Sequence, residues 1–349
     1  KAFMAMAVIA GTTSCDDFLD REPMSSISPE TYYSTAAQLE ANLNDEYPNV
    51  LPSFGQWTYG IFGEDKGTDN QIEVNANDRY TQDRWKVPHS ESDNWKFERI
   101  YRINFFLSEA LPKFGEDMSG SQNTISGSVA TIKHYIGEMY FLRAYEYFKK
   151  LQLFGDFPII NQPLADEMEA LREASKRFPR NEVARFIISD LDKAYAYMSD
   201  VDMATTRINK DVAMLVKSRV ALFEATWLQN FKGTAFVPGG EGWPGASLHN
   251  NYQYPSGNID NEVKYFLEQA VEASKLVADK YKGSLTENTG VLQQSADDPS
   301  NPYFDMFGAE DMSGFDEVLL WRQYDKGLGI MHAVVQFASR GNAGVGLTR

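Results

Sequence analysis

The chain has 349 residues, with 33 basic and 49 acidic side chains and a formal net charge of −16. This length is enough to bury a substantial core in one large domain or two ordinary ones, and an apolar share of 43% does not indicate disorder. The negative charge argues against nucleic acid and other anionic polymers as partners, so a neutral ligand fits the composition best.

The N-terminal segment around the single cysteine, Cys15, predicts a secretory signal and a lipid anchor. A lone cysteine provides no internal disulfide, no redox pair and no cysteine zinc site. Residues 2–10 form a short apolar run and small residues at 11–14 lead to Cys15, an order typical of a signal cut directly before a lipidated cysteine. Thr12 departs from this pattern, because such signals usually carry Leu there. We expect residues 1–14 to be a signal peptide remnant and Cys15 to carry the lipid; an incidental cysteine is the alternative.

Apolar side chains recur at helical spacing in several segments. These segments are residues 95–111, 131–153, 181–198, 211–228 and 262–281. Residues 131–153 are apolar almost all round in the middle, which predicts a central and buried helix. Strand-like alternation is sparse, so the sequence predicts an all-α fold of repeat-like helix pairs.

Two long irregular stretches, residues 51–90 and 231–258, are rich in aromatic side chains. They contain Trp57, Trp85 and Trp243 among Gly, Asp, Asn and Pro. Loops of this length in a compact domain are usually functional, and solubility does not require their aromatics. We therefore expect the binding face to lie in these stretches.

Three segments resemble the SusD/RagB family. Residues 15–23 (CDDFLDREP) resemble the start of its mature proteins, C-x-D-F-L-D-x-x-P, and residues 95–104 (WKFERIYRIN) resemble its tryptophan-led helix. Residues 137–158 contain G-E-x-x-F-L-R-A followed by L-F-G-D-x-P, which resembles the strongest motif of the family. The resemblance extends from Cys15 to the end. Family members normally continue well beyond Arg349, so we expect the chain to be truncated at its C-terminus.

The resemblance implies one SusD-like glycan-binding domain over residues 15–349, with a tetratricopeptide-like helix-pair superhelix as scaffold and loop-rich insertions as the binding face. It implies a surface-exposed lipoprotein of the outer membrane, without catalysis or cofactor. Such a protein binds oligosaccharides and delivers them to a SusC-type TonB-dependent transporter. RagB-like peptide binding on the same type of transporter is the alternative. A helical glycoside hydrolase is a further one, because 49 acidic residues guarantee some carboxylate pair.

Sugar binding requires flat apolar platforms for the C–H face of a pyranose ring and planar polar groups for its hydroxyls. Trp57, Trp85 and Trp243 fit the first need, and Asp65, Asp69 and Asn70 fit the second. Trp321 and Tyr324 are further candidate ligand contacts. For each loop tryptophan, packing of the loop against the scaffold is the alternative.

Motifs for other chemistry are weak in this sequence. The turn at residues 65–69 lacks the third acidic oxygen and the glutamate at position twelve of a calcium loop. The histidines are scattered without metal-ligand spacing. No G-x-S-x-G or P-loop motif is present, so acyl and nucleotide chemistry have no support.

Overall fold

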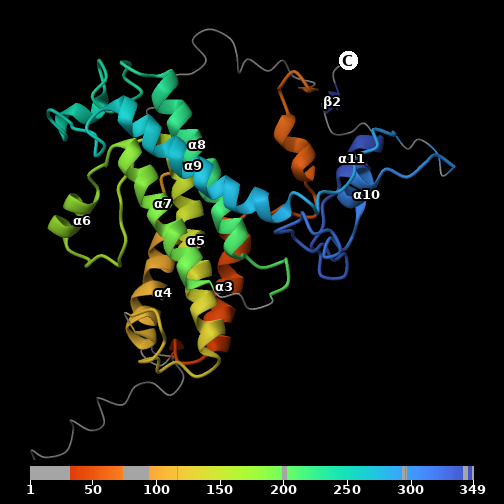
Figure 1. The fold of residues 1–349 in the computed structure, drawn as a ribbon, viewed down its shortest axis with the longest axis horizontal. Helices are drawn as coiled ribbons and strands as arrows, with labels where there is room; N and C mark the ends of the chain where they lie inside the picture. The colour runs from red at the N-terminus through yellow and green to blue at the C-terminus, as the bar shows by residue number, and fades with distance from the viewer. Residues whose placement is uncertain are drawn as a thin grey trace, which may run out of the picture.

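The computed structural model describes residues 32–73, 94–115, 117–198, 203–292, 295, 297–340 and 345–347. These residues are mostly helical (Figure 1). The helices are α3 (Ala36–Val50), α4 (Glu98–Phe114), α5 (Val129–Phe154), α6 (Met168–Ala174), α7 (Arg180–Tyr197), α8 (Lys210–Asn230), α9 (Ile259–Tyr281), α10 (Pro302–Gly308) and α11 (Val334–Arg340), with the 3-10 turns η1 (Gly60–Asp65) and η2 (Pro244–Ser247). The short strand β1 (Gln71–Glu73) pairs antiparallel with β2 (Val345–Leu347), which places Gln71 opposite Leu347.

Helix α5 is the centre of the fold. The side chain of Ser128 caps its start by accepting the backbone N–H of Thr131, and Gly155 ends it with a positive φ of 67°. Helices α3, α4 and α7 all pack against it, and Met139 and Leu142 in its middle are fully buried. The prediction of a central, buried helix is confirmed.

The helices from α4 to α9 form successive antiparallel pairs, with the short α6 outside the stack (Figure 1). Paired helices are joined by polar contacts between their side chains, in Asn104–Arg143, Arg143–Asp190, Lys217–Asp192 and Lys280–Asp211. The predicted all-α architecture of helix pairs is therefore confirmed. Within the described residues, no helix is both long enough and apolar enough to cross a membrane.

The segment that carries the strongest family resemblance builds the scaffold. Arg143 of α5 is buried, and its Nε and Nη2 donate to the fully buried carboxylate of Asp190 at 2.6 and 2.9 Å. Its Nη1 donates to Asn104 of α4 at 2.8 Å, so one guanidinium holds three helices together. A Cβ at Gly137 would lie 2.8 Å from the backbone nitrogen of Met198, so only glycine allows α7 to end this close to α5.

A second buried charge on α5, Glu138, joins α3 to the chain before α8. Its carboxylate accepts Nε and Nη2 of Arg207 at 3.0 and 2.8 Å, and the hydroxyl of Tyr47 donates to it at 2.5 Å. The Tyr47 hydroxyl also accepts the backbone N–H of Ile208. Burial raises the pKa of Tyr47 well above its ordinary value, so this hydroxyl stays protonated as the donor. Burying a carboxylate is tolerable here because every partner is in place.

Candidate functional site

Most of the predicted site residues lie where two distant segments of the chain meet. We call the contact region of residues 51–73 with residues 319–339 the junction. Arg322 Nη1 donates to Ser53 Oγ at 2.5 Å, and the backbone N–H of Ala333 donates to the carbonyl of Thr58 at 2.9 Å. Just beyond the junction, the pairing of β1 with β2 also ties residues 71–73 to the C-terminal part of the chain, and Figure 1 shows the early strand beside the blue C-terminal segments.

Some of the predicted site residues lie at the junction, and the others do not. Those at the junction are Trp57, Asp65, Asp69, Asn70, Trp321 and Tyr324. Trp243 lies in the loop after α8 and is not brought near them. Cys15 and Trp85 lie outside the described residues, so their predicted roles stay predictions.

The first hollow at the junction is bounded by Trp321 and has a volume of about 510 Å³; we call it the Trp321 hollow. The indole is fixed by Thr205, whose hydroxyl accepts Trp321 Nε1 at 2.8 Å and whose carbonyl accepts Trp321 N–H at 3.1 Å. The lining comes from α3 and the loop after it, α5, α8 and the C-terminal segment. It consists of Tyr47, Pro48, Leu51, Pro52, Phe141, Tyr145, Thr206, Val212, Val216, Leu320, Trp321, Arg322, Gln323 and Ile330.

The chemistry of the Trp321 hollow is that of aromatic walls with a few polar groups. Phe141 and Tyr145 of α5 line it together with Trp321, and Thr206, Arg322 and Gln323 supply its hydrogen-bonding groups. No carboxylate is among the described residues that line it. An apolar concavity with a small number of polar groups is the usual form of a small-ligand site.

The second hollow at the junction is bounded by Trp57 and has a volume of about 460 Å³; we call it the Trp57 hollow. The Trp57 side chain is 69% exposed, so most of its ring is open to a ligand. His332 of this hollow packs edge-on against Tyr324, with ring centroids 5.3 Å apart. Tyr324 thus connects the C-terminal wall of the Trp57 hollow to the segment that carries Trp321.

The polar candidates Asp65, Asp69 and Asn70 are all exposed. Asp65 ends η1, and Asp69 and Asn70 lie in the turn that leads to β1. The turn is closed locally, because Thr68 donates both its N–H and its hydroxyl to the carbonyl of Asp65 and accepts the N–H of Asn70. Among the described residues no group of His, Cys, Asp and Glu side chains has the arrangement of a metal site.

Trp243 is held in a different way from Trp57, although both were predicted as loop platforms. It is only 5% exposed, and its Nε1 donates to Asp156 at 2.7 Å. Its ring lies against Tyr252, with centroids 5.6 Å apart. This geometry fits the alternative of loop packing, and Trp243 also lines a separate hollow beyond the end of α5.

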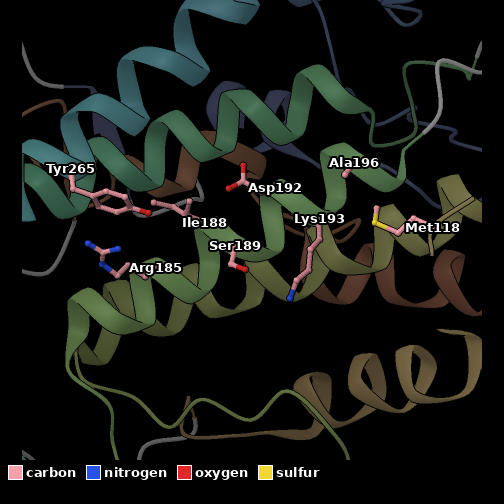
Figure 2. A pocket seen from close by; sticks show the side chains of 8 residues that line it. All are labelled: Met118, Arg185, Ile188, Ser189, Asp192, Lys193, Ala196 and Tyr265. Atoms are coloured by element: carbon pink, nitrogen blue, oxygen red, sulfur yellow. The ribbon is translucent and has the colours of Figure 1, made fainter. Parts of the chain in front are cut away.

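A shallow groove of about 360 Å³ runs along α7, and its lining side chains are strung out along the helix rather than converging (Figure 2). Its charged groups are already paired with other residues of the bundle. Arg185 bonds Glu262 and stacks on Tyr265 at 3.7 Å, and Asp192 accepts Lys217 Nζ at 2.7 Å. Arg185 and Asp192 are therefore already engaged by the protein itself rather than available to a ligand.

Sequence reasoning missed the aromatic walls contributed by the scaffold. Tyr47, Phe141 and Tyr145 all line the Trp321 hollow, yet each belongs to a helix. Phe141 lies within the strongest motif and Tyr145 soon after it, but helical spacing assigns such residues to the core. Their role as walls of a hollow becomes apparent only in the fold, where Trp321 lines the same hollow as residues of α5 and α8.

The comparisons with known proteins found a family model and several SusD-like proteins. Residues 17–222 match the SusD-like family model described as "Starch-binding associating with outer membrane". SusD-like protein P2 of Formosa agariphila is 26% identical over 64% of this chain and 43% of its own length. A SusD-like carbohydrate binding protein of Bacteroides vulgatus covers 74% of this chain and 47% of its own, with 16% identity and a TM-score of 0.45. A laminarin binding SusD-like protein has 16% identity and a TM-score of 0.44 over 73% of this chain and 45% of its own.

The chain thus spans less than half the length of these relatives. The family match nevertheless covers more than half of the chain, and it runs from before α3 into α8. It includes both the Arg143–Asp190 and the Glu138–Arg207 contacts that hold the helix pairs together. This chain belongs to the SusD-like family.

Proposed function

We propose that this protein binds neutral oligosaccharides at the junction and acts without catalysis. The observation that carries the proposal is the gathering of Trp57, Trp321 and Tyr324, from segments some 260 residues apart in the chain, beside two hollows. The description of the family as starch-binding supports the ligand class. The net charge of −16 supports a neutral rather than an anionic glycan.

The two tryptophans would have different parts in binding. The exposed ring of Trp57 can stack on the C–H face of a pyranose at the rim, because its face is open to solvent. Trp321 is half-buried and fixed by Thr205, so it can act as a wall with little loss of side-chain entropy on binding. Thr206, Gln323 and Arg322 can then bond hydroxyl groups, and Asp65, Asp69 and Asn70 can reach a longer chain from the solvent side.

Binding without hydrolysis is the simplest use of these hollows. A glycosidase needs a carboxylic acid and a carboxylate on either side of the scissile bond. The described lining residues of both the Trp321 and the Trp57 hollow include neither Asp nor Glu. The protein would therefore capture a glycan and release it unchanged.

The proposed cellular setting follows from the sequence and the family. A lipid on Cys15 would hold the protein on the outer surface of the outer membrane, and a SusC-type TonB-dependent transporter would receive the ligand. The description of the family as associating with the outer membrane supports this setting. The capture step would then raise the local concentration of glycan at the transporter.

Peptide binding is the second candidate, and the Trp321 hollow gives it one specific argument. Much of its lining is aliphatic, from Pro48, Leu51, Val212, Val216 and Leu320, which also suits apolar peptide side chains. Isothermal titration of the full chain with neutral glucans and with apolar peptides of similar length distinguishes the two. We expect saturable binding of a glucan, with the glucan recovered intact. Binding of peptides alone, or release of shortened glucan, would contradict the proposal.

A further inference from the structure

A hollow at the other end of the helical bundle has the chemistry of a second ligand site. It has a volume of about 470 Å³, and we call it the distal hollow. It is lined by Gln152, Leu153, Phe154, Gly155, Asp156, Arg177, Arg180, Trp227, Ala235, Phe236, Trp243, Pro244, Gly245 and Leu248. Along α8, Val212 of the Trp321 hollow and Trp227 of the distal hollow are about 22 Å apart by helical rise. Figure 1 shows the loop after α8 on the side of the bundle opposite to α10 and α11.

The aromatic wall of the distal hollow is rigidly held and partly open. Trp227 Nε1 donates to the carbonyl of Phe236 at 3.0 Å, which ties the loop to α8. The guanidinium of Arg180 lies over the Trp227 ring, 4.1 Å from its centroid. Phe236 itself is 62% exposed, so the loop presents an aromatic ring to solvent at the rim. Such a ring can stack on the apolar face of a ligand.

Arg180 supplies a fixed donor beside this wall. Its side chain is buried, and Nε and Nη2 donate to the fully buried Glu224 at 3.0 and 2.8 Å. Nη1 has no hydrogen-bond partner among the described residues, and it lies 3.4 Å from the position that a Cβ on Gly155 would take. Because Gly155 has no side chain, the approach to Nη1 from the hollow stays open. The ion pair with Glu224 neutralises the charge of Arg180. Nη1 of Arg180 can therefore donate to a neutral ligand and does not require an anion.

Three further polar groups complete the distal hollow. Asp156 accepts Trp243 Nε1 at 2.7 Å and the backbone N–H of Arg180 at 2.9 Å, which fixes its carboxylate while leaving further lone pairs. Arg177 is exposed and stacks on Trp95 at 4.5 Å, and it has no ion-pair partner among the described residues. Gln152 is exposed at the end of α5. Since Arg177 and Asp156 carry opposite charges, the distal hollow is close to neutral overall.

We propose that the distal hollow is a second saccharide subsite, in which Phe236 stacks on a neutral sugar ring while Arg180 Nη1, Arg177 and Asp156 bond its hydroxyls. An aromatic face beside fixed donors and a fixed acceptor matches a polyhydroxylated ring better than an aliphatic or an anionic ligand. The inference uses the ligand class of the proposed function but not the junction. A long glucan that reaches both sites would bind more tightly than a short one, because the second contact becomes intramolecular.

The test uses short neutral glucans, maltotriose and laminaritriose, titrated calorimetrically into the full chain. We expect two binding sites for at least one probe. Phe236→Ala removes one of them and leaves the backbone carbonyl that holds Trp227 in place. Arg177→Met weakens the same site by about tenfold. Phe304→Ala is the matched control, because Phe304 is an exposed aromatic that lines neither hollow.

The outcomes separate this inference from the proposed function. A site lost in Phe236→Ala but kept in Trp321→Ala supports the distal subsite, even if the junction binds no sugar. The inference is overturned if neither probe binds the wild-type chain at millimolar concentration, or if the only site disappears in Trp321→Ala. It is equally overturned if Phe236→Ala and Arg177→Met, with unchanged melting temperatures, keep the stoichiometry and affinity of the wild type.

Discussion

Removing the carboxylate of Asp190 should be among the most damaging single changes in the scaffold. Asp190 is fully buried and accepts two hydrogen bonds from Arg143, while Lys193 Nζ lies 3.6 Å away and is half exposed. In Asp190→Ala, Nε and Nη2 of a buried guanidinium lose their acceptors. Breaking a buried ion pair in this way costs about 3–5 kcal/mol, far more than an exposed pair is worth.

A double-mutant cycle separates the interaction from its burial cost. Arg143→Met keeps the length of the side chain but leaves Asp190 without its main partner, and Asp190→Leu does the reverse. The combination should lose much less stability than the sum of the two, with a coupling energy of about 2–3 kcal/mol. Urea unfolding followed by far-ultraviolet circular dichroism measures all four proteins. Single variants that cost under about 1 kcal/mol, or strictly additive costs, would refute the argument that this pair holds α5 to α7.

Three more changes test other parts of the structure. Leu142→Ala, in the fully buried middle of α5, should cost about 2–5 kcal/mol in urea unfolding, and a cost below about half a kcal/mol would show that α5 is peripheral. Burial raises the pKa of Asp156 above its ordinary 3.8, so its ionised form is disfavoured in the fold. The stability of the wild type relative to Asp156→Asn should therefore fall as pH rises from about 3.8 through the folded pKa, and a rise measured by thermal melts would reverse the assignment. Cys15→Ala should release the protein from the membrane fraction without unfolding it, and full retention in the absence of the transporter would contradict lipidation.

The long helices could be predicted because their apolar spacing is regular. The predicted segment 131–153 corresponds to α5 (Val129–Phe154), and 211–228 corresponds to α8 (Lys210–Asn230). At the start of α4 the prediction was early by three residues. Trp95 has helical spacing to the following apolar residues, but it lies before the helix and packs against Phe157 at 4.8 Å. Tertiary packing decided that boundary rather than the local pattern.

Helix α3 was not predicted, although its signals are present. Thr35 and Gln38 form a capping box, and Leu39 and Leu43 are one turn apart and fully buried. The segment is otherwise polar, and Pro48 lies in its last turn. These features obscure an amphipathic pattern that becomes clear only when α3 packs beside α5.

The binding face could be predicted only in outline. Trp57 and Trp243 look alike in the sequence, since each lies in a glycine-rich loop, but they are 69% and 5% exposed. The difference arises because Asp156, far away in the sequence, accepts the indole N–H of Trp243. The position of Trp321 likewise depends on Thr205, 116 residues before it. Local sequence contains neither contact.

The central claim is that the junction binds a neutral glycan, and Trp321→Ala tests it most directly. The measurement is calorimetric titration of the full chain with a neutral glucan, paired with a thermal melt of each protein. Thr205→Val is the matched control, because it removes the hydrogen bond to Trp321 Nε1 while keeping the indole wall. We expect Trp321→Ala to lose about 2 kcal/mol of binding free energy, near thirtyfold in affinity, and Thr205→Val to lose much less. Wild-type affinity in both Trp321→Ala and Trp57→Ala, in folded protein, would place the glycan site elsewhere and contradict the account.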